Sequence, residues 1–412
     1  MEYGCIGEKL SHSFSKEIHA RLFDYNYELK EIAPDDLRDF MYKGDFKAIN
    51  VTIPYKREVL KYLEAIDETA VQIGAVNTVV NRNGMLFGYN TDFSGLKALI
   101  EVNGIEIKDK KVLILGSGGT SKTALAVAEF LGAKTVFRVS RGGNDGCITY
   151  EQAVNEHGDA DVIINTTPCG MYPKIGECAI DIDKLKKLSA VVDAVYNPLR
   201  SELVIRGLKR GIKAVGGLYM LVSQAVFAAE HFMSVEIEKS VTDRIFKEMY
   251  ALKENIVLIG MPGCGKSTVG KALSNELGFD FVDSDEEIVK RAGVTIPEIF
   301  SQSGEEGFRK LEAEVIKSLS ALQHTVIATG GGVILNERNV DLLRQNGRLV
   351  FLDRSLEKLA MTDDRPLSSD FEKLKKRYEE RYDKYKNSAD IIIDADGSIE
   401  ENVNAIKAEW AK

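Results

Sequence analysis

The chain has 412 residues, which at about 150 residues per domain predicts two or three domains. Hydrophobic residues make up 44% and charged residues 28%, the composition of a folded globular protein rather than a disordered or collagen-like one. Lys and Arg number 54 against 63 Asp and Glu, and neither half of the chain is basic. This charge balance argues against a nucleic-acid partner, because neutralising phosphates requires clustered cations.

Local patterns exclude further classes of protein. No stretch approaches the ~20 apolar residues of a membrane span, and the first residues mix charge with polarity, so we expect neither a membrane partner nor a signal peptide. The five cysteines are scattered and form no CxxC pair, which is typical of the reducing cytoplasm and excludes a disulfide scaffold. The composition therefore favours small-molecule chemistry in the cytoplasm, and it leaves an oligomer possible.

The first half of the chain predicts two lobes. Residues 1–100 hold strands at 48–53 and 75–80 together with helical stretches, enough for a separate lobe. Residues 110–133 then pass from an apolar run through a glycine-rich turn into a helix rich in Ala and Leu.

Short apolar strands follow at 134–140, 161–168 and 190–198. Strands and helices that alternate at this spacing predict βαβ units and a parallel sheet. Helical sequence from about 219 to 252 closes this half, and we expect it to return to the first lobe.

The second half predicts another parallel α/β domain, over residues 254–412. Its four expected strands lie at 255–260, 325–332, 348–353 and 389–394, separated by polar helical sequence.

A phosphate-binding motif opens this domain. GMPGCGKST, residues 260–268, fits the pattern G-x-x-x-x-G-K-[ST], in which backbone N–H groups and a helix N-terminus face phosphate oxygens. Lys266 is expected to reach the β- and γ-phosphates, and the Ser267 hydroxyl to hold Mg²⁺. The residues expected to bind ATP are Gly263, Cys264, Gly265, Ser267 and Thr268. The loop alone indicates only a nucleotide, since a GTPase switch carries one too.

Two carboxylates follow in the segment FVDSDEE. Asp283 and Asp285 share one face if the segment is extended. Phosphoryl transfer to an alcohol needs a metal ligand and a group that aligns or deprotonates the acceptor hydroxyl, and two carboxylates can divide these roles. Taken alone, such an acidic run is more often a solvated surface or a helix N-cap.

Further motifs in this domain are FRKLE at 308–312, ATGGGV at 328–333, DDRPL at 363–367 and ERYDKY at 380–385. Through these and the motifs above, residues 254–412 resemble shikimate kinase. The resemblance implies that Ser267 and Asp283 ligate Mg²⁺, and that Asp285 binds the shikimate hydroxyls and acts as or orients the base. It implies a clamp on the substrate carboxylate by Arg309, Arg381, Gly331 and Gly332, and a lid residue, Arg365, that neutralises the transferring phosphoryl group. Residues 354–366 depart from the family because they lack the additional arginine often placed before the Arg-Pro step.

The first half carries a dinucleotide-type turn. GSGGTSK, residues 116–122, follows a strand and opens a helix, although Ser121 stands where a third Gly or Ala is usual. A glycine turn in a fold without a cofactor is the alternative. The next strand ends at Ser140 and Arg141 instead of the Asp or Glu of an NAD site. A guanidinium there suits the 2′-phosphate of NADP, and the alternative is an arginine that only faces solvent.

Reduction of a ketone also needs a proton donor near the carbonyl oxygen. The histidines of this half form no obvious pair with a carboxylate. Lys56 in NVTIPYK follows an apolar strand and a proline turn, which places a lysine at a strand end. Asp92 in GYNTDFSG is a plausible partner that holds the ammonium. From spacing alone the pair is a hypothesis, because most Lys and Asp residues are surface charges.

Residues 1–250 resemble shikimate dehydrogenase through HSFS (12–15), NVTIPYK (50–56), GAVNT (74–78), GYNTD (88–92), NTTPCGM (165–171), DAVYNP (193–198) and GGLYMLVSQA (216–225). The resemblance implies that Lys56 and Asp92 form the catalytic dyad. It implies substrate hydrogen bonds from Ser13, Ser15, Thr52, Asn77, Asp92, Tyr196 and Gln224. It implies NADP binding by Gly116, Ser117, Gly118, Gly119, Thr120, Ser140, Arg141 and Gly217.

These observations predict an α/β protein. We expect a substrate-binding lobe (1–100, with helices 219–252), a Rossmann NADP-binding lobe (101–218) and a P-loop domain like a nucleoside monophosphate kinase (254–412). The resemblances imply reduction of 3-dehydroshikimate by NADPH and phosphorylation of shikimate by MgATP. The alternatives are a non-catalytic metabolite sensor, or a quinate/shikimate dehydrogenase fused to another small polyol kinase.

Overall fold

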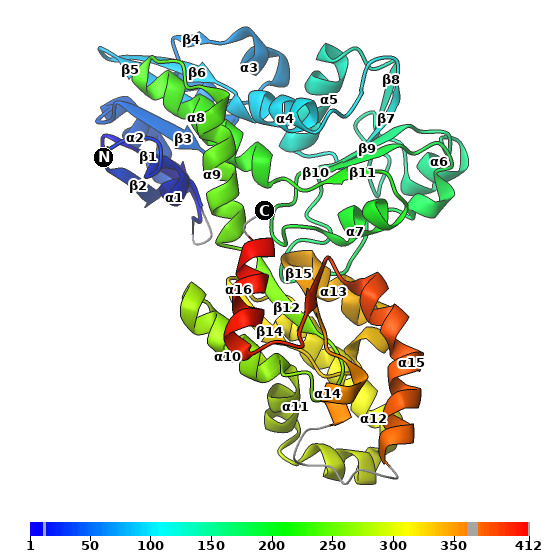
Figure 1. Ribbon diagram of the computed structural model, residues 1–412. Helices are drawn as coiled ribbons and strands as arrows, with labels where there is room; N and C mark the ends of the chain where they lie inside the picture. Colours follow the sequence, from blue (N-terminus) through cyan, green and yellow to red (C-terminus); the bar gives the residue numbers. More distant parts are fainter. Residues whose placement is uncertain (11–13, 361–369, 411–412) are drawn as a thin grey trace. The chain divides into compact units, whose positions relative to one another are not determined.

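The computed structural model describes residues 1–10, 14–360 and 370–410, which form two compact units (Figure 1). The first unit comprises Met1–Met171, Glu177–Asn197 and Arg206–Tyr250, and the second comprises Tyr172–Gly176, Pro198–Ile205 and the chain from Ala251 onward. Parallel strands with helical crossovers recur in both units. The predicted α/β fold class is confirmed.

The first unit begins with a six-stranded mixed sheet in the order β2-β1-β3-β5-β6-β4. Its strands are β1 (Tyr3–Gly7), β2 (Tyr27–Glu31), β3 (Ala48–Val51), β4 (Ala65–Ile66), β5 (Thr78–Arg82) and β6 (Met85–Tyr89). β1 runs parallel to β2 and β3, whereas β5 is antiparallel to both β3 and β6. β3 and β6 therefore run in the same direction and end at the same edge of the sheet. Short helices α1 (Ser15–His19), α2 (Leu37–Lys43) and α3 (Glu68–Ile73) accompany it.

The second sheet of this unit is fully parallel, in the order β11-β10-β9-β7-β8. Its strands are β7 (Lys111–Leu115), β8 (Thr135–Val139), β9 (Val162–Asn165), β10 (Ala190–Asp193) and β11 (Lys213–Val215), with helices α5 (Gly119–Phe130), α6 (Tyr150–Asn155) and α7 (Glu202–Lys209). The strands are Val- and Ile-rich because helices bury the sheet, and Val112, Ile164 and Val192 are completely inaccessible to solvent. The sequence predicted every strand here except the short β11.

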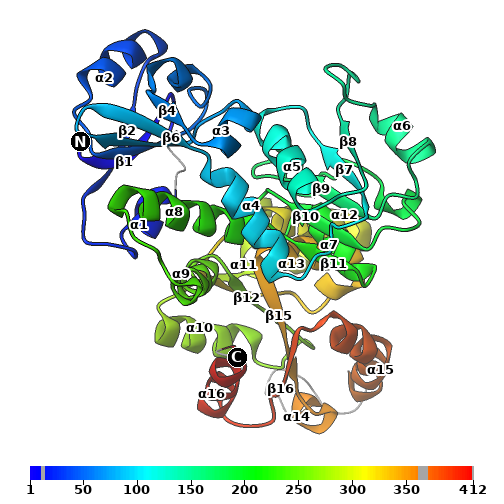
Figure 2. The ribbon, with the colours of Figure 1, turned by 90° about the horizontal axis from the view of Figure 1, so that it is seen from above.

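Two long helices of the first unit pack against each other. α4 (Thr91–Val102) and α8 (Leu218–Met233) lie side by side, as Figure 2 shows, and pack closely because Gly95 of α4 faces the backbone of α8. The expected helical stretch 219–252 is broken. α8 is capped at its C-terminus by Ser234, whose φ of 54° is left-handed. α9 (Lys239–Ala251) follows a short connection, in which the N–H of Ile237 donates a hydrogen bond to the Glu230 side chain.

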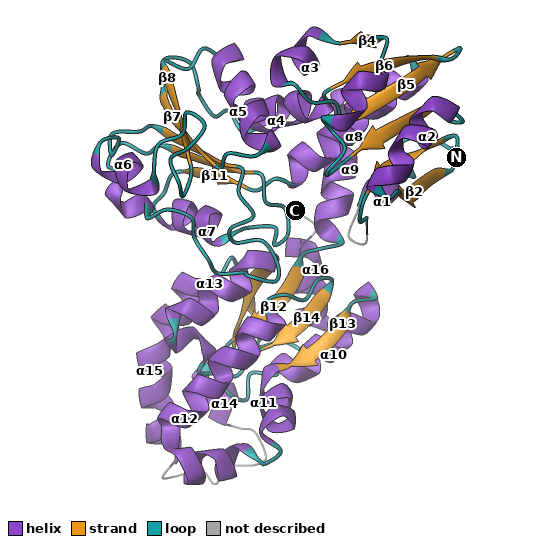
Figure 3. Cartoon of the chain, turned by 180° about the vertical axis from the view of Figure 1, so that it is seen from behind, coloured by secondary structure: helices purple, strands orange, loops and turns teal. Residues whose placement is uncertain are grey.

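The second unit contains a five-stranded parallel sheet, β13-β14-β12-β15-β16. Its strands are β12 (Asn255–Ile259), β13 (Asp280–Asp283), β14 (Thr325–Ala328), β15 (Gly347–Asp353) and β16 (Ile391–Asp394). Its helices are α10 (Lys266–Leu277), α11 (Ser284–Ala292), α12 (Ile296–Leu319), α13 (Glu337–Asn346), α14 (Leu356–Ala360), α15 (Asp370–Ser388) and α16 (Ile399–Trp410). Figure 3 shows strands of this sheet lying between helices. The sequence predicted four of the strands and missed β13, a short edge strand whose ends are acidic.

Among the described residues, no helix is both long enough and apolar enough to cross a bilayer.

Candidate active sites

A cavity of about 560 Å³ in the first unit gathers most of the residues predicted to bind a substrate there. Ser15, Thr52, Lys56, Asn77, Asp92, Tyr196 and Gln224 all line it. They come from α1, from the chain after β3 and β6, from the residue before β5, from α8 and from the chain after β10. Ser13 lies outside the described residues. Segments far apart in the sequence thus supply one pocket.

Lys56 and Asp92 form an ion pair in this cavity. Lys56 Nζ lies 2.5 Å from Asp92 Oδ2, with 27% of the lysine and 10% of the aspartate side chain exposed. Lys56 follows β3, and Asp92 lies in the first turn of α4, where the helix dipole stabilises a negative charge. The pair therefore presents an oriented ammonium at the cavity wall.

Asn77 is held so that it can act only as a donor toward a ligand. Its Oδ1 accepts hydrogen bonds from the N–H of Thr91 at 2.8 Å and from the Thr91 and Thr78 hydroxyls at 3.2 and 3.1 Å. Its Nδ2 reaches Gln224 Oε1 at 3.5 Å, a long contact that a ligand oxygen can replace. Asn77 and Gln224 are therefore suited to a ligand that carries hydroxyl groups.

The described histidines of this unit are poor proton donors. Burial lowers the pKa of His19, which lines the cavity, to about 3. Burial also lowers the pKa values of His157 and His231. These rings are neutral at pH 7. Lys56 is the cation on the cavity wall with a fixed carboxylate partner, which supports the choice of lysine over histidine as the acid.

The glycine-rich turn after β7 is open to a ligand. A Cβ on Gly118 or Gly119 would meet no atom within 4 Å, and the N-cap Gly118 places no side chain over the first turn of α5. Gly116 has a φ of 118°, and a Cβ there would press on Thr166. Ser121, at the third position of the motif, is fully buried, and its hydroxyl donates to the Gly118 carbonyl at 2.9 Å. An anion can therefore reach backbone N–H groups at this helix end, which fits a dinucleotide pyrophosphate.

The other predicted cofactor residues divide into two groups. Ser117, Thr120 and the exposed Arg141 stand in or after the two βα turns of the sheet, and Ser140 Oγ accepts the N–H of Gly143 at 3.1 Å. Gly217 has a different environment, because its N–H already donates to the Val195 carbonyl at 2.8 Å and a Cβ would overlap the Ala194 carbonyl. The close approach of α8 to the end of β10 therefore leaves no room for a side chain here, and a contact of Gly217 with the cofactor stays a prediction.

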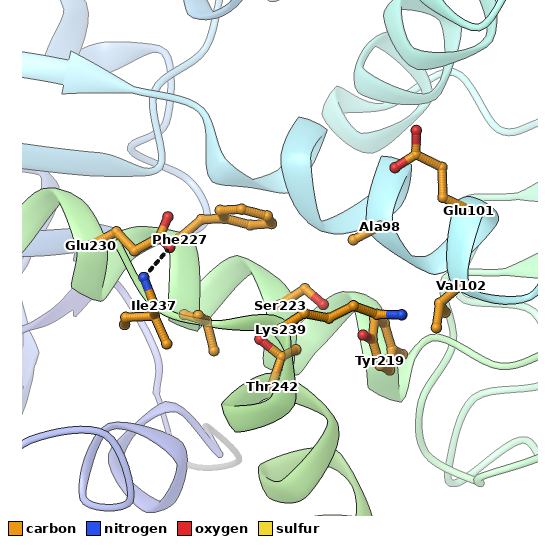
Figure 4. A pocket seen from close by; sticks show the side chains of 11 residues that line it. Ala98, Glu101, Val102, Tyr219, Ser223, Phe227, Glu230, Ile237, Lys239 and Thr242 are labelled. Carbon is orange, nitrogen blue, oxygen red and sulfur yellow. Dashed lines mark hydrogen bonds between the residues drawn. The ribbon is translucent and has the colours of Figure 1, made fainter. Parts of the chain in front are cut away.

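A second cavity, of about 340 Å³, lies between α4, α8 and α9 (Figure 4). Figure 4 shows Phe227 and Tyr219 of α8 beside it, with Lys239 extended across it. None of the predicted site residues lines this cavity. α8 therefore borders both cavities, and Gln224 lines the first one.

In the second unit the phosphate-binding loop connects β12 to α10. Gly263 and Gly265 have φ values of 88° and 92°, which other residues rarely adopt. Lys266 is 8% exposed, and its ammonium donates to the carbonyls of Gly260 and Met261, each at 2.9 Å. Its described hydrogen bonds include no carboxylate. A buried cation bonded to neutral oxygens at a helix N-terminus fits a bound phosphate.

Oxygen atoms suited to Mg²⁺ meet beside this loop. Ser267 Oγ lies 2.5 Å from Asp283 Oδ2, and Asp283 Oδ1 accepts the N–H of Asp285 at 2.9 Å. Mg²⁺ is usually held by one or two carboxylates together with substrate phosphates and water, so this hydroxyl and carboxylate fit it.

The three glycines after β14 make room for other site residues. A Cβ on Gly330 would lie 2.5 Å from Asp285 Oδ1, and one on Gly331 would lie 2.7 Å from Pro262 of the phosphate-binding loop. A Cβ on Gly332 would overlap the Arg309 guanidinium. The glycine backbone therefore lies directly against a carboxylate, a phosphate loop and a guanidinium, which explains why side chains are absent there.

Two arginines and a carboxylate face this backbone. Arg309 Nη1 donates to both oxygens of the buried Glu312, at 3.0 and 2.9 Å. Arg381 Nη1 donates to the Gly331 carbonyl at 2.8 Å. Burial, and then the neighbouring Asp283, raise the pKa of Asp285. Guanidinium groups that flank a carboxylate in this way can hold an acidic substrate with one hydroxyl against Asp285. Arg365 lies outside the described residues.

Three further residues were not assigned a role from sequence. Asn50 lines the first cavity, and its Oδ1 accepts a hydrogen bond from the Tyr27 hydroxyl at 2.7 Å. Because Asn50 lies two residues before Thr52 in an extended segment, both side chains are expected on the same face, and this spacing could have indicated Asn50. Glu312 fixes Arg309 and was visible only as the last letter of FRKLE. The Tyr385 hydroxyl donates to the Gly331 carbonyl at 2.5 Å, four residues after Arg381 and so on the same helix face.

These features define two enzyme classes in one chain, a dinucleotide-dependent oxidoreductase and a P-loop phosphoryl transferase. Comparison with known proteins agrees. Residues 5–79 match the shikimate dehydrogenase substrate binding domain, and residues 262–410 match shikimate kinase. The chain belongs to the shikimate dehydrogenase family and carries a shikimate kinase domain in its second half.

Individual relatives cover the first part of the chain. Over 270 residues it is 36% identical to the NADP(+) shikimate dehydrogenase of Clostridium beijerinckii, covering 61% of this chain and 98% of that protein. A chorismate mutase/shikimate 5-dehydrogenase fusion protein from Clostridium acetobutylicum is similar in structure, with a TM-score of 0.57 and 37% identity over 60% of this chain and 96% of its own. A shikimate dehydrogenase crystallised with NADP⁺ has a TM-score of 0.51 and 30% identity, over 60% of this chain and 94% of its own.

The overlap at Gly332 generates a prediction for the arginine clamp. Gly332→Ala places a methyl group on the Arg309 guanidinium and displaces it. We expect KM for the acidic substrate of the second unit to rise about tenfold or more, as for the loss of one charge-assisted hydrogen bond, while KM for ATP stays within about twofold. Steady-state kinetics measure both values. Gly142→Ala, at an exposed glycine of the first unit where a Cβ would meet only the Asn144 side chain, is the control. Equal loss for both substrates would contradict a clamp specific to the acid.

Proposed function

We propose that the candidate site of the first unit and that of the second act in succession on one cyclic hydroxy acid. The protein is a bifunctional shikimate-pathway enzyme: its dehydrogenase reduces 3-dehydroshikimate to shikimate with NADPH, and its kinase phosphorylates shikimate with MgATP. The observation that supports the site assignment best is the Lys56–Asp92 pair within a cavity lined by hydroxyl-binding groups. We further infer the division into lobes at 1–100 and 101–218 and a kinase domain at 254–412.

In the dehydrogenase, Lys56 Nζ donates a proton to the ketone oxygen as this oxygen gains negative charge. NADPH supplies the hydride when it is bound, and we assign it to the turn formed by Gly116, Ser117, Gly118, Gly119 and Thr120, with Ser140 and Arg141 toward the 2′-phosphate. Asp92 holds the ammonium in position to meet the oxygen, since their 2.5 Å contact fixes both side chains. Asn77, Gln224, Thr52, Ser15 and Tyr196 hold the ring substituents.

In the kinase, Asp285 accepts the proton of the attacking hydroxyl. MgATP supplies the phosphoryl group when bound; Lys266 and the backbone of Gly263, Cys264, Gly265, Ser267 and Thr268 would hold its phosphates, and Ser267 with Asp283 would hold Mg²⁺. Arg309 and Arg381 bind the substrate carboxylate, with the backbone of Gly331 and Gly332. We retain Arg365 as the lid arginine on the resemblance alone.

We also infer a cytoplasmic enzyme without a nucleic-acid or membrane partner, and an oligomer is compatible with it. The five cysteines are all free, which supports the cytoplasmic location. The net charge of −9 supports the absence of a nucleic-acid partner.

The lysine assignment predicts a selective loss. Lys56→Met removes the proton donor and leaves Asp92 in place, so kcat for reduction of 3-dehydroshikimate should fall by about 10² to 10⁴, as for general-acid removal. Phosphorylation of shikimate by the same protein should not change. NADPH consumption and ADP release measure the two activities. Lys61→Met, an exposed lysine nearby that pairs with Glu58, is the control and should keep both activities. Near-normal reduction by the Lys56 variant would contradict the assignment.

The environment of Asp285 predicts a pH dependence. Its basic form is the active one, and burial together with Asp283 raises its pKa. Kinase kcat should therefore decline, as pH falls, at a pH above the ordinary Asp value of about 3.9. Asp285→Asn should lower kcat by about 10² to 10⁴ at every pH and leave dehydrogenase activity unchanged. A variant that kept the wild-type kcat and pH profile would exclude Asp285 as the base.

A further inference from the structure

The phosphate-binding loop divides the carboxyl edge of the kinase sheet into two sides. The loop follows the central strand β12. Toward β13 and β14 lie Asp283, Asp285 and the three glycines that face the arginine clamp. Of the site residues assigned above, Arg381 comes from α15, which follows β15, and its Nη1 reaches the carbonyl of Gly331 after β14. The acidic substrate is assigned to the β14 side of the loop. The part of the nucleotide that extends beyond the loop can therefore lie on the β15 side.

Arg354 is the first residue after β15, and it reaches the phosphate-binding loop. Its Nη1 lies 3.9 Å from the position that a Cβ on Gly265 would occupy, so the guanidinium borders the residue directly before Lys266. The approach follows from the sheet, because Ile259 of β12 pairs with Phe351 of β15. The arginine therefore stands beside the backbone that binds phosphates.

The guanidinium is not used by the neighbouring carboxylates. Asp353 Oδ2 accepts the Tyr382 hydroxyl at 2.9 Å, and Asp396 Oδ1 accepts the N–H of Ser355 at 2.9 Å. Arg354 contributes only a small part of the lowered pKa of Asp396, which the hydrogen bond from Ser355 dominates. Arg354 Nε is buried, and no atom in the described part of the chain accepts its hydrogen.

A buried donor without a hydrogen-bond partner lowers the stability of the fold, and a ligand that accepts this hydrogen bond removes the penalty. An arginine provides five donors in a planar fork that matches phosphate oxygens, and it is always charged at neutral pH.

We propose that Arg354 binds the phosphate chain of the kinase's nucleotide, from the β15 side of the loop. The assignment rests on the proposed kinase function, and it concerns nucleotide binding rather than the transfer step. Arg354 would hold ATP and ADP while the acidic substrate is bound independently on the β14 side.

The test is calorimetric titration of the full chain with ADP, inorganic tripolyphosphate and adenosine. Arg354→Gln removes the charge and keeps polar bulk, Arg354→Lys restores a charge, and Arg291→Ala changes an exposed arginine of α11 as the matched control. We expect Arg354→Gln to weaken ADP and tripolyphosphate about ten- to hundredfold, as for the loss of a charge-assisted hydrogen bond. Arg354→Lys should recover part of the affinity, and KM for shikimate should stay within about twofold.

Unchanged ADP affinity in Arg354→Gln would overturn the proposal. Weaker ADP and adenosine binding with unchanged tripolyphosphate binding would also overturn it, because the contact would then be to the base. Dehydrogenase activity and the circular dichroism spectrum identify a variant that fails to fold, and Arg354→Ala then replaces it. If wild-type protein binds ADP but does not phosphorylate shikimate, the proposed kinase function fails while the assignment of Arg354 still stands on the ADP titrations.

Discussion

Both candidate sites depend on strands that end at a common edge. A strand buried on both faces carries apolar side chains throughout, so charged groups can stand only where the strand ends and the chain reaches solvent. Lys56 and Asp92 follow β3 and β6, which run in the same direction although antiparallel β5 separates them. In the kinase domain the phosphate-binding loop, Asp285 and Gly330 follow β12, β13 and β14 in the same way. The shared edge therefore brings together the segments that carry the reactive groups.

The second common feature is close approach of the backbone. Gly330, Gly331 and Gly332 each lie where a methyl group would meet Asp285, Pro262 or Arg309. This packing lets the carbonyl of Gly331 bind both Arg381 and Tyr385, so the arginine is oriented by the strand end itself. At Gly217 the close contact is of another kind, between α8 and the end of β10, although the motif GGLYMLVSQA also contains Gln224, which lines the first cavity. The same residue type thus serves a ligand pocket in one place and helix packing in another.

Sequence was most informative where chemistry dictates spacing along the chain. The phosphate-binding loop and the parallel strands could be predicted because their glycine positions and apolar runs are local. The pairing of Lys56 with Asp92 was a hypothesis from motifs, and the structure brings the two side chains together. Local signals could not reveal β13, which is short and acidic at its ends, or the break at Ser234, which depends on a hydrogen bond between Glu230 and Ile237. Arg354 was invisible for the same reason, because its neighbour Gly265 is distant in sequence and close only through strand pairing.

The central claim is that one chain binds the same cyclic acid in two separate pockets. Equilibrium titration of the full protein with shikimate, without nucleotides, tests this claim most directly. The account predicts two sites per chain, of which Gln224→Ala weakens one and Arg381→Ala the other. A stoichiometry of one, or a single variant that removes all binding, would contradict it.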